Sequence, residues 1–322
     1  KGTLILTCTG LVSRIAGFFY MIFLSHAIGA EGLGLYQLIL PLQGLMAALS
    51  YTGIQSALSR LIASRLALQE KKEAYFSLVT GIFAAVFFSA VTGFLLFRHA
   101  DFFASTILKA PGTSDLLRLT AASIPLCAIH SCIDSYYYAR KKASVPAAVQ
   151  LSEQTVRIGA TYILYLIFLS EGRPVTAMIA AGGSLAGEAA ASLISLLMVS
   201  FHFGNHPVKE KTSVKIFPLI KDLFTLSFPI SLNRILLTLL GSIEAVLIPQ
   251  MLIRCGMTSS EALKIYGIFT GMALPLLLFP STITTSAAVM LMPSVARMDA
   301  LGDQKQIRHV TDQTFFLCMF LG

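Results

Sequence analysis

Eight long apolar stretches, separated by short polar segments, constrain the fold of this chain more than any other feature. Most of them exceed twenty residues, and a helix needs about 20 residues to cross a hydrocarbon core about 30 Å thick. A ninth apolar run begins near residue 314. The pattern predicts an all-α polytopic membrane protein with spanning helices near residues 4–28, 33–58, 74–97, 116–138, 147–170, 175–201, 222–250 and 266–292.

The composition leaves little room for a soluble fold or for an enzyme. Only 12% of the residues are charged, against roughly a quarter in soluble domains. The five cysteines lie in apolar stretches without a CxxC pair, and the six histidines have no metal-ligand spacing, so neither a metal nor another cofactor is expected. The chain also lacks a Gly-rich phosphate loop, a GxSxG motif and a catalytic cluster, which argues against an enzyme.

The basic residues indicate the orientation in the cell membrane. Of the 24 Lys and Arg residues, 15 fall in one set of alternate loops, six fall in the opposite set, and three lie within spans. Because cytoplasmic loops retain positive charge, this bias predicts a multi-pass protein with a cytoplasmic amino terminus. The same bias accounts for the net charge of +8 without a nucleic-acid partner.

Six charged residues within the apolar stretches are candidates for a functional site, because a charge there costs at least ~2.5 kcal/mol and usually faces a bundle interior or a wet cavity. Arg14, about ten residues into the first span, is a candidate for gripping a phosphate bidentately, or alternatively for a structural pair with a glutamate on another span. Arg234 is a second phosphate candidate. The six residues are Arg14, Glu153, Arg157, Glu188, Arg234 and Glu244.

The acidic members of this set have two interpretations. Glu153 and Arg157 are four residues apart and share a helix face, so they either neutralise each other or line a cavity and exchange partners during transport. Glu188 is a further charge partner. Glu244 is a candidate for binding a coupling proton or cation, although it lies too far along its span from Arg234 for direct contact.

Three motifs resemble one family of membrane proteins. They are Gly10-Leu-Val-Ser-Arg14-Ile-Ala-Gly17-Phe18 with the Gly-rich residues 28–37, Gln150-Leu-Ser-Glu153-Gln154-Thr-Val-Arg157, and residues 274–280 with 291–297. Together they are similar to the stage V sporulation protein B-like polysaccharide exporters, which are related to the lipid II flippase. The resemblance implies two pseudo-symmetric six-helix lobes around a central cavity.

Applied to this chain, the resemblance implies a first lobe of six transmembrane helices at residues 1–210. Residues 211–322 would then hold spans seven and eight and the beginning of span nine, so the second lobe is incomplete in this chain. The longest internal polar segment, near residues 202–221, coincides with this boundary. The sequence has no initiator Met and stops inside an apolar run, from which we expect a fragment of a longer protein.

The resemblance also implies a substrate. Arg14 matches a cavity arginine of the lipid II flippase in the context Ser-Arg-x-x-Gly-Phe, whereas Tyr20, Met46 and Thr270 stand near positions where that protein has further arginines. We therefore expect Arg14, Arg157 and Arg234 to cradle the pyrophosphate of a polyprenyl-linked saccharide. Membrane lipids and a coupling cation would be the other partners.

The function predicted on this basis is that of a flippase. It would move an undecaprenyl-linked saccharide, a peptidoglycan or spore-cortex precursor, from the inner to the outer leaflet. Two alternatives remain open at this point. One is a multidrug exporter of the same superfamily, and the other is a scaffold of a cell-wall synthesis complex that transports nothing.

Overall fold

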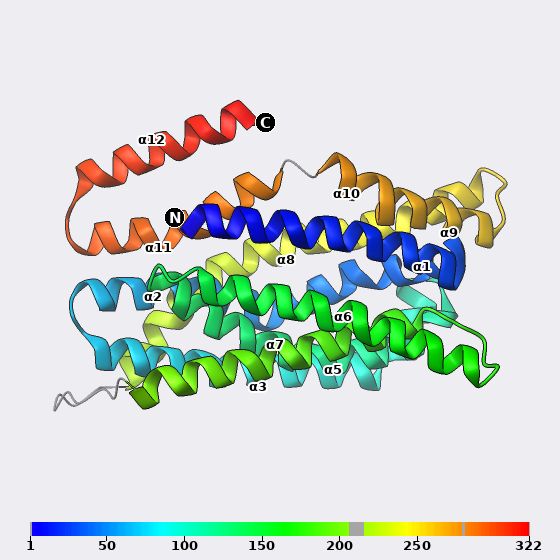
Figure 1. Ribbon diagram of the computed structural model, residues 1–322, viewed down its shortest axis with the longest axis horizontal. Helices are drawn as coiled ribbons and strands as arrows, with labels where there is room; N and C mark the ends of the chain where they lie inside the picture. The colour runs from blue at the N-terminus through cyan, green and yellow to red at the C-terminus, as the bar shows by residue number, and fades with distance from the viewer. Residues whose placement is uncertain (1, 206–215, 279–280, 322) are drawn as a thin grey trace.

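The computed structural model describes residues 2–205, 216–278 and 281–321. In this part of the chain the backbone is almost entirely helical, and most helices lie along one long axis (Figure 1), which confirms the predicted all-α class. The elements in chain order are α1 (Gly2–Ala47), the π-helical turn η1 (Ala48–Thr52), α2 (Gly53–Ala67), α3 (Lys71–Arg98), α4 (Ala100–Phe102), the π-helical turn η2 (Phe103–Ile107), the 3-10 turn η3 (Pro111–Thr113), α5 (Ser114–Ala139), α6 (Ser144–Ser170), α7 (Met178–Asn205), α8 (Ile216–Arg254), α9 (Ser259–Ile268), the π-helical turn η4 (Phe269–Ala273), α10 (Leu274–Leu277), α11 (Ser281–Ala300) and α12 (Gln304–Leu321).

The first two spans form a hairpin with no loop between them. The helical run Leu4–Ala67 has 64 residues, and a straight helix of that length would be about 96 Å long, some three times the thickness of a bilayer core. The run folds back at Gly29, whose φ of 73° lies in the left-handed region that glycine adopts without steric cost. The two legs run antiparallel (Figure 1), and the Gln37 amide donates across them to the Met21 sulfur at 3.6 Å.

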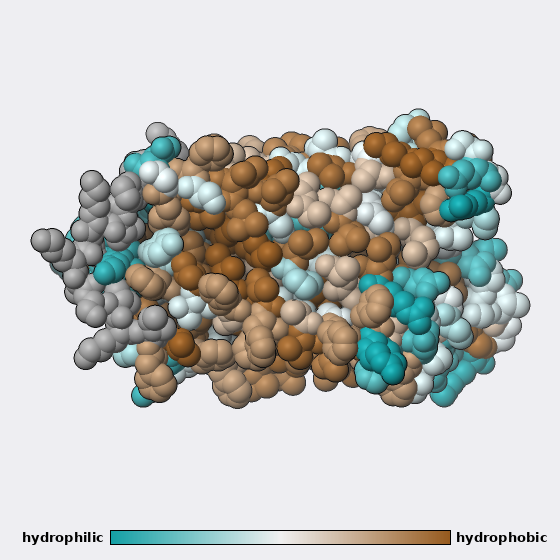
Figure 2. Space-filling view, turned by 90° about the horizontal axis from the view of Figure 1, so that it is seen from below, coloured by the Kyte–Doolittle hydropathy of each residue, from teal (hydrophilic) through white to brown (hydrophobic). Residues whose placement is uncertain are grey.

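The protein is a multi-pass membrane protein. Besides Leu4–Ala67, the described residues contain four more helical stretches long and apolar enough to cross a membrane: Lys71–Arg98, Pro111–Ala139, Met178–Asn205 and Phe217–Arg254. Large apolar side chains point outward from them, among them Phe83 and Phe94 of α3 and Phe201 of α7, each at least 67% exposed. Figure 2 shows apolar residues over the middle of one face and hydrophilic residues gathered toward its right end. Lipid, rather than water, stabilises such a surface.

The connections between helices gather at the two ends of the bundle (Figure 1). One end, here called the amino-terminal end, holds the beginning of α1 and the turns α2–α3, α5–α6 and α11–α12. The opposite end, here called the Gly29 end, holds the fold of α1 and the connections α6–α7 and α8–α9. Alternate loops therefore lie at opposite ends, as the charge argument requires. The assignment of the amino-terminal end to the cytoplasm stays a prediction.

The eighth predicted span, residues 266–292, differs from the observed helices. The helix α9 begins at Ser259, because the Thr258 hydroxyl accepts the Glu261 N–H at 3.3 Å and the Glu261 carboxylate accepts the Thr258 N–H at 2.9 Å. This capping box starts the helix within a polar segment that hydropathy does not single out. The helical run ends at Leu277 and resumes at Ser281, so the span is in two pieces. Pro280, where the sequence favours a kink, lies outside the described residues.

The ninth span also begins earlier than its apolar run. The helix α12 starts at Gln304, ten residues before residue 314, and the Asp303 carboxylate accepts the backbone N–H of Gln306 at 3.1 Å. An N-cap of this kind accepts a hydrogen bond from a backbone N–H that would otherwise have no partner at the helix start. Polar capping chemistry, which hydropathy ignores, thus sets both of these helix starts.

At the Gly29 end, α9 packs against the α1 hairpin almost backbone to backbone. A Cβ atom on Gly267 would lie 2.6 Å from the Gly34 nitrogen and 2.8 Å from the Ala30 carbonyl oxygen. Beside this contact the Ser260 hydroxyl donates to the Glu31 carboxylate at 2.6 Å. Small residues permit this approach, and α9 is therefore closely joined to the α1 hairpin at this end.

At the amino-terminal end α2 and α8, which lie on either side of the predicted lobe boundary in sequence, meet through an ion pair. The Arg65 guanidinium of α2 lies 3.0 Å from Asp222 of α8, and it also contacts Glu70 and Glu73 beside it. The predicted lobe boundary at residue 210 falls within residues 206–215, outside the described residues. The division into lobes 1–210 and 211–322 stays a prediction.

Candidate functional site

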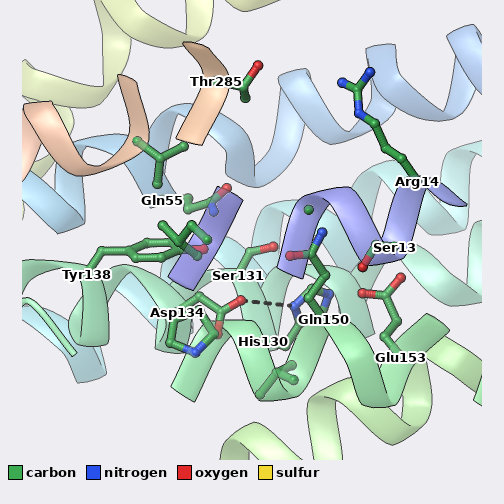
Figure 3. Close-up of a pocket in the computed structure, with 15 residues that line it drawn as sticks. Ser13, Arg14, Gln55, His130, Ser131, Asp134, Tyr138, Gln150, Glu153 and Thr285 are labelled. Atoms are coloured by element: carbon green, nitrogen blue, oxygen red, sulfur yellow. Dashed lines mark ion pairs between the residues drawn. The ribbon is translucent and has the colours of Figure 1, made fainter. Parts of the chain in front are cut away.

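A polar cavity of about 440 Å³ lies between the first part of the chain and α11, and we call it the central cavity. Its walls come from α1, α2, α5 and α6 on one side and from α11 on the other (Figure 3). Most of the polar lining is contributed by α5 and α6, which follow each other in sequence. The lining residues are Leu6, Gly10, Ser13, Arg14, Gln55, His130, Ser131, Asp134, Tyr138, Pro146, Val149, Gln150, Glu153, Thr285 and Val289.

Arg14 lies where this cavity meets an apolar one. The second cavity, of about 300 Å³, is bounded by α1, η4 and α10, and Phe18 and Met21 are among its apolar lining residues. The Arg14 guanidinium donates to the Leu278 carbonyl oxygen at 2.5 Å. Leu278 follows the last residue of α10, where helix carbonyls lack intrahelical partners and carry partial negative charge. Arg14 is thus placed at a polar–apolar boundary and at a helix end.

Arg234 lines a neighbouring cavity. Its side chain, on α8, is exposed to a space of about 320 Å³ that α2, α5, α8 and α11 enclose. This space and the central cavity have four lining residues in common: Gln55, Tyr138, Thr285 and Val289. Arg14 and Arg234 therefore face adjoining cavities from α1 and α8.

Arg157 is engaged by carboxylates. Its guanidinium forms an ion pair with Glu153 on the same helix and lies 4.0 Å from the Glu188 carboxylate on α7. Arg157 is not among the described residues that line the central cavity or the Arg234 cavity. The structure brings Glu153, Arg157 and Glu188 together, and the phosphate-binding role of Arg157 stays a prediction.

Two residues that the sequence reading passed over complete this cluster. His130 Nε2 lies 2.8 Å from the Glu188 carboxylate, and His130 Nδ1 lies 3.8 Å from Asp134. Both residues are on α5, four positions apart and hence on one face. A carboxylate and an imidazole four residues apart inside the predicted span 116–138 are the sequence signal that points to this part of the site.

Glycines explain why the charged groups of α6 and α7 meet. A Cβ atom on Gly187 of α7 would lie 3.0 Å from the Glu153 carbonyl oxygen and 3.1 Å from the Arg157 Cβ. A Cβ atom on Gly183 would clash with the Thr161 hydroxyl. The absence of side chains at these two positions lets α7 approach α6 closely enough to place Glu188 beside Arg157.

The cluster contains one group of potential metal ligands. Within the described residues, donor atoms of Cys127, His130 and Glu188 lie within 4.8 Å of one another. Each has a protein partner already: the Tyr51 hydroxyl donates to the Cys127 sulfur at 2.9 Å, and Glu188 contacts both His130 and Arg157. The Arg157 guanidinium supplies the positive charge that an ion would bring, so hydrogen bonding accounts for this arrangement.

Glu244 lies in a different place from the arginines. It lines a cavity of about 290 Å³ between α1, α8, α9 and η4, together with Gln37, Tyr266 and Thr270. The Glu244 side chain is exposed to this space. Its proposed role in binding a cation stays a prediction.

Comparisons with known proteins agree with this architecture. A family model described as "Polysaccharide biosynthesis protein" matches residues 1–299. Stage V sporulation protein B of Bacillus subtilis (strain 168) is 30% identical over 331 residues, and the lipid II flippase MurJ of the same organism is 21% identical over 345 residues. Each alignment covers 100% of this chain and 62% of the relative.

The fold itself occurs among solved transporters. The MATE multidrug transporter DinF-BH superposes with a TM-score of 0.74 at 16% identity, covering 99% of this chain and 69% of that one. At this identity the likeness concerns the fold alone. The chain spans 62% of the length of the two curated relatives named above. Because the family model matches most of its residues, this chain belongs to the polysaccharide biosynthesis protein family.

Proposed function

We propose that the full-length protein is a flippase that moves an undecaprenyl-linked saccharide from the inner to the outer leaflet. The cargo would be a peptidoglycan or spore-cortex precursor, in keeping with the names of the relatives. One observation carries the proposal: Arg14 is shared by a polar cavity and an apolar cavity. A lipid-linked saccharide has the same division, with a pyrophosphate between its sugar and its chain.

The positive charge of the Arg14 guanidinium supports this orientation of the cargo. A guanidinium binds phosphate oxygens in a bidentate manner, and it does so more strongly where water is scarce. The saccharide would then occupy the central cavity, and the polyprenyl chain would leave through the apolar cavity beside Phe18 and Met21. Arg234, facing the adjoining cavity, would receive the pyrophosphate or a second anionic group later in the cycle.

The two lobes would rock about this site. The central cavity has walls from both proposed lobes, since Thr285 and Val289 belong to the second. With the amino terminus in the cytoplasm, the close packing of Gly34 and Gly267 would seal the outer end. Export of net negative cargo would gain ~2.3 kcal/mol per charge per 100 mV of membrane potential, and a cation at Glu244 is a second candidate for the driving force. The proposal requires no catalytic step.

The first test is leaflet exchange in vesicles. Full-length protein would be reconstituted, and the exchange of a labelled polyprenyl-pyrophosphate saccharide would be followed for wild type, Arg14→Ala, and the control Arg173→Ala. Arg173 pairs with Glu171 in an exposed turn and lines none of the cavities described above. We expect Arg14→Ala to lower the rate about tenfold or more, as for loss of a charged hydrogen bond, and the control to match wild type. No exchange by correctly inserted wild type, under any voltage or ion gradient, would refute the proposal.

A multidrug exporter is the second candidate, favoured by the acidic groups Asp134 and Glu153 in the central cavity. Organic cations would bind to such carboxylates. The two candidates separate in one assay, in which vesicles are offered a cationic dye with a proton gradient and, in parallel, the polyprenyl lipid. Dye efflux without lipid exchange would select the exporter.

A further inference from the structure

Buried polar atoms without a hydrogen-bond partner in the protein converge on the central cavity. Among the residues that the structure describes, five buried side-chain nitrogen or oxygen atoms have no hydrogen-bond partner in the protein. Three of them, Ser13 Oγ, His130 Nδ1 and Asp134 Oδ1, belong to residues that line this cavity. A buried polar atom that stays without a hydrogen-bond partner destabilises the folded state. Their gathering at one cavity points to a ligand that bonds to them.

These atoms are held in place by neighbouring groups. His130 is buried, and its Nε2 is fixed by Glu188 at 2.8 Å, which leaves Nδ1 as the second ring nitrogen. Asp134 lies one helical turn further along α5, with its Oδ2 3.8 Å from that nitrogen, beyond hydrogen-bond length. The wall is therefore prepared before a ligand arrives, which lowers the cost of binding.

The chemistry of this wall suits hydroxyl groups. A carboxylate oxygen accepts O–H donors, an imidazole nitrogen and a serine hydroxyl either accept or donate, and the amides of Gln55 and Gln150 do both. Among the described lining residues Tyr138 brings the single six-membered aromatic ring, so this wall lacks the paired rings that stack on a flat dye. A sugar ring carries hydroxyls in the pattern that these groups require.

The negative charge of Asp134 in this wall would discriminate between neutral and acidic sugars. The charge of Glu153 is neutralised by Arg157. Among the described ion pairs, Asp134 has only His130 as a partner, and His130 is a cation only when it is protonated. Figure 3 shows the Arg14 guanidinium well apart from Asp134. A sugar carboxylate against this wall would face the Asp134 carboxylate in a medium of low dielectric, where like charges repel strongly.

We infer that the wall formed by Ser13, His130 and Asp134 is the subsite for the sugar joined to the pyrophosphate, and that it selects a neutral or amino sugar against a uronic acid. The position of the pyrophosphate at Arg14 rests on the proposed function. The sugar subsite itself stands on the three unpaired atoms. Rejection of acidic sugars is then a property of Asp134.

The test compares three lipids on the full-length protein in nanodiscs. The probes are undecaprenyl pyrophosphate without sugar, the same lipid carrying N-acetylglucosamine, and the same lipid carrying glucuronic acid. Wild type is expected to bind the N-acetylglucosamine lipid about tenfold more tightly than the glucuronic acid lipid. Asp134→Asn keeps the shape and is expected to reduce that ratio to about two or less. Its affinity for the sugarless lipid would stay within about twofold of wild type.

Two further variants keep the test interpretable. Ser13→Ala removes a hydroxyl that has no hydrogen-bond partner, without changing the charge. It should weaken binding of the N-acetylglucosamine lipid by a few-fold and leave the preference against glucuronic acid intact. Asp101→Asn, at an exposed ion pair with Arg118, is the control and should match wild type. Equal affinity of wild type for the two sugar lipids, or an unchanged ratio in a folded Asp134→Asn protein, would overturn the inference.

A soluble probe separates this inference from the proposed function. Saturation-transfer NMR with the methyl glycosides of N-acetylglucosamine and glucuronic acid reports sugar binding without any lipid. Transfer to the N-acetylglucosamine glycoside but not to the glucuronic acid glycoside in wild type, with this preference lost in Asp134→Asn, supports the subsite even if no polyprenyl lipid is bound or moved. Lipid exchange with no discrimination between sugars in either assay leaves the flippase standing and refutes the subsite.

Discussion

Gly34 lies directly against the backbone carbonyl of Leu263, so that a Cβ atom at position 34 would clash with it. The contact joins the α1 hairpin to α9 at the Gly29 end. Gly34→Ala should therefore destabilise the protein by about 1–3 kcal/mol, as overpacking does in well-packed interiors, and should slow transport by holding this end open. Thermal unfolding in detergent and vesicle exchange measure the two effects.

The matched control is Gly159→Ala. Gly159 is within α6, and a Cβ atom there would meet nothing within 4 Å. Alanine favours a helix more than glycine does, so this variant should be as stable as wild type or slightly more stable. Equal behaviour of the two variants would show that the Gly34 contact does not form in the membrane.

The Glu153–Arg157 pair should behave as a unit. Arg157→Gln alone leaves Glu153 without its partner and is expected to cost about 3–5 kcal/mol, whereas Glu153→Gln with Arg157→Gln together should cost much less. A double-mutant cycle in thermal unfolding measures the coupling. Exchange by the double variant decides the role of Arg157: a phosphate ligand predicts loss of transport, and a purely structural residue predicts that transport is kept.

Arg234 and Glu244 line separate cavities and should give separable phenotypes. Arg234→Ala is expected to weaken binding of the polyprenyl-pyrophosphate lipid several-fold, as loss of a charged contact does, without changing how transport responds to an ion gradient. Glu244→Gln is expected to leave lipid binding unchanged and to remove that response. Binding in nanodiscs and exchange with and without a gradient are the two measurements. Identical changes in both variants would count against separate roles.

The α9 capping box should make this helix start sensitive to acid. Hydrogen bonds from the Thr258 backbone N–H and hydroxyl lower the pKa of Glu261, which lies in the first turn of α9, before the predicted span 266–292. A lowered pKa means that the bonds stabilise the folded state above the ordinary pKa of a glutamate and are lost as the pH falls through the lower value. The protection of the first-turn amides of α9, measured as their exchange rate relative to that of an unfolded chain at the same pH, should therefore fall in acid, below about pH 4.

The variant Glu261→Gln tests the same cap at neutral pH. It removes the charge that accepts these bonds, so the first turn should exchange several-fold faster than in wild type. The protection of these amides in the variant should then change little as the pH falls from about 7 to below about 4, the range in which wild type loses its protection. An acid-induced loss of protection as large as that of wild type would assign the effect to another group.

Apolar spacing alone was enough to predict the helical class, the order of the spans and the sorting of loops to two ends, because hydrophobic length is a direct requirement of the bilayer. It did not predict the early starts of α9 and α12, which depend on Thr258 with Glu261 and on Asp303. These are short-range hydrogen bonds in polar segments.

The candidate site was predicted in part. The six candidate charged residues could be found from their positions in the spans, and the spacing of Glu153 and Arg157 predicted that they share a helix face, but His130 and Asp134 were missed. The contact between Glu188 and His130 could not be predicted, because it depends on glycines of α7 that allow a close approach to α6. Which residues meet across helices is decided by packing, and a single sequence contains little of that information.

The fold at Gly29 has a mechanical consequence. Because a single residue reverses the chain, no loop separates the two legs of the hairpin, and we expect them to tilt together. In the proposed rocking motion the Gly29 end would then be the pivot, and displacement would grow with distance from it. Over a membrane about 30 Å thick, a tilt of about 10° would move the far end by about 5 Å. The largest opening for a bulky saccharide would then occur at the amino-terminal end, where Arg65 and Asp222 now hold α2 and α8 together.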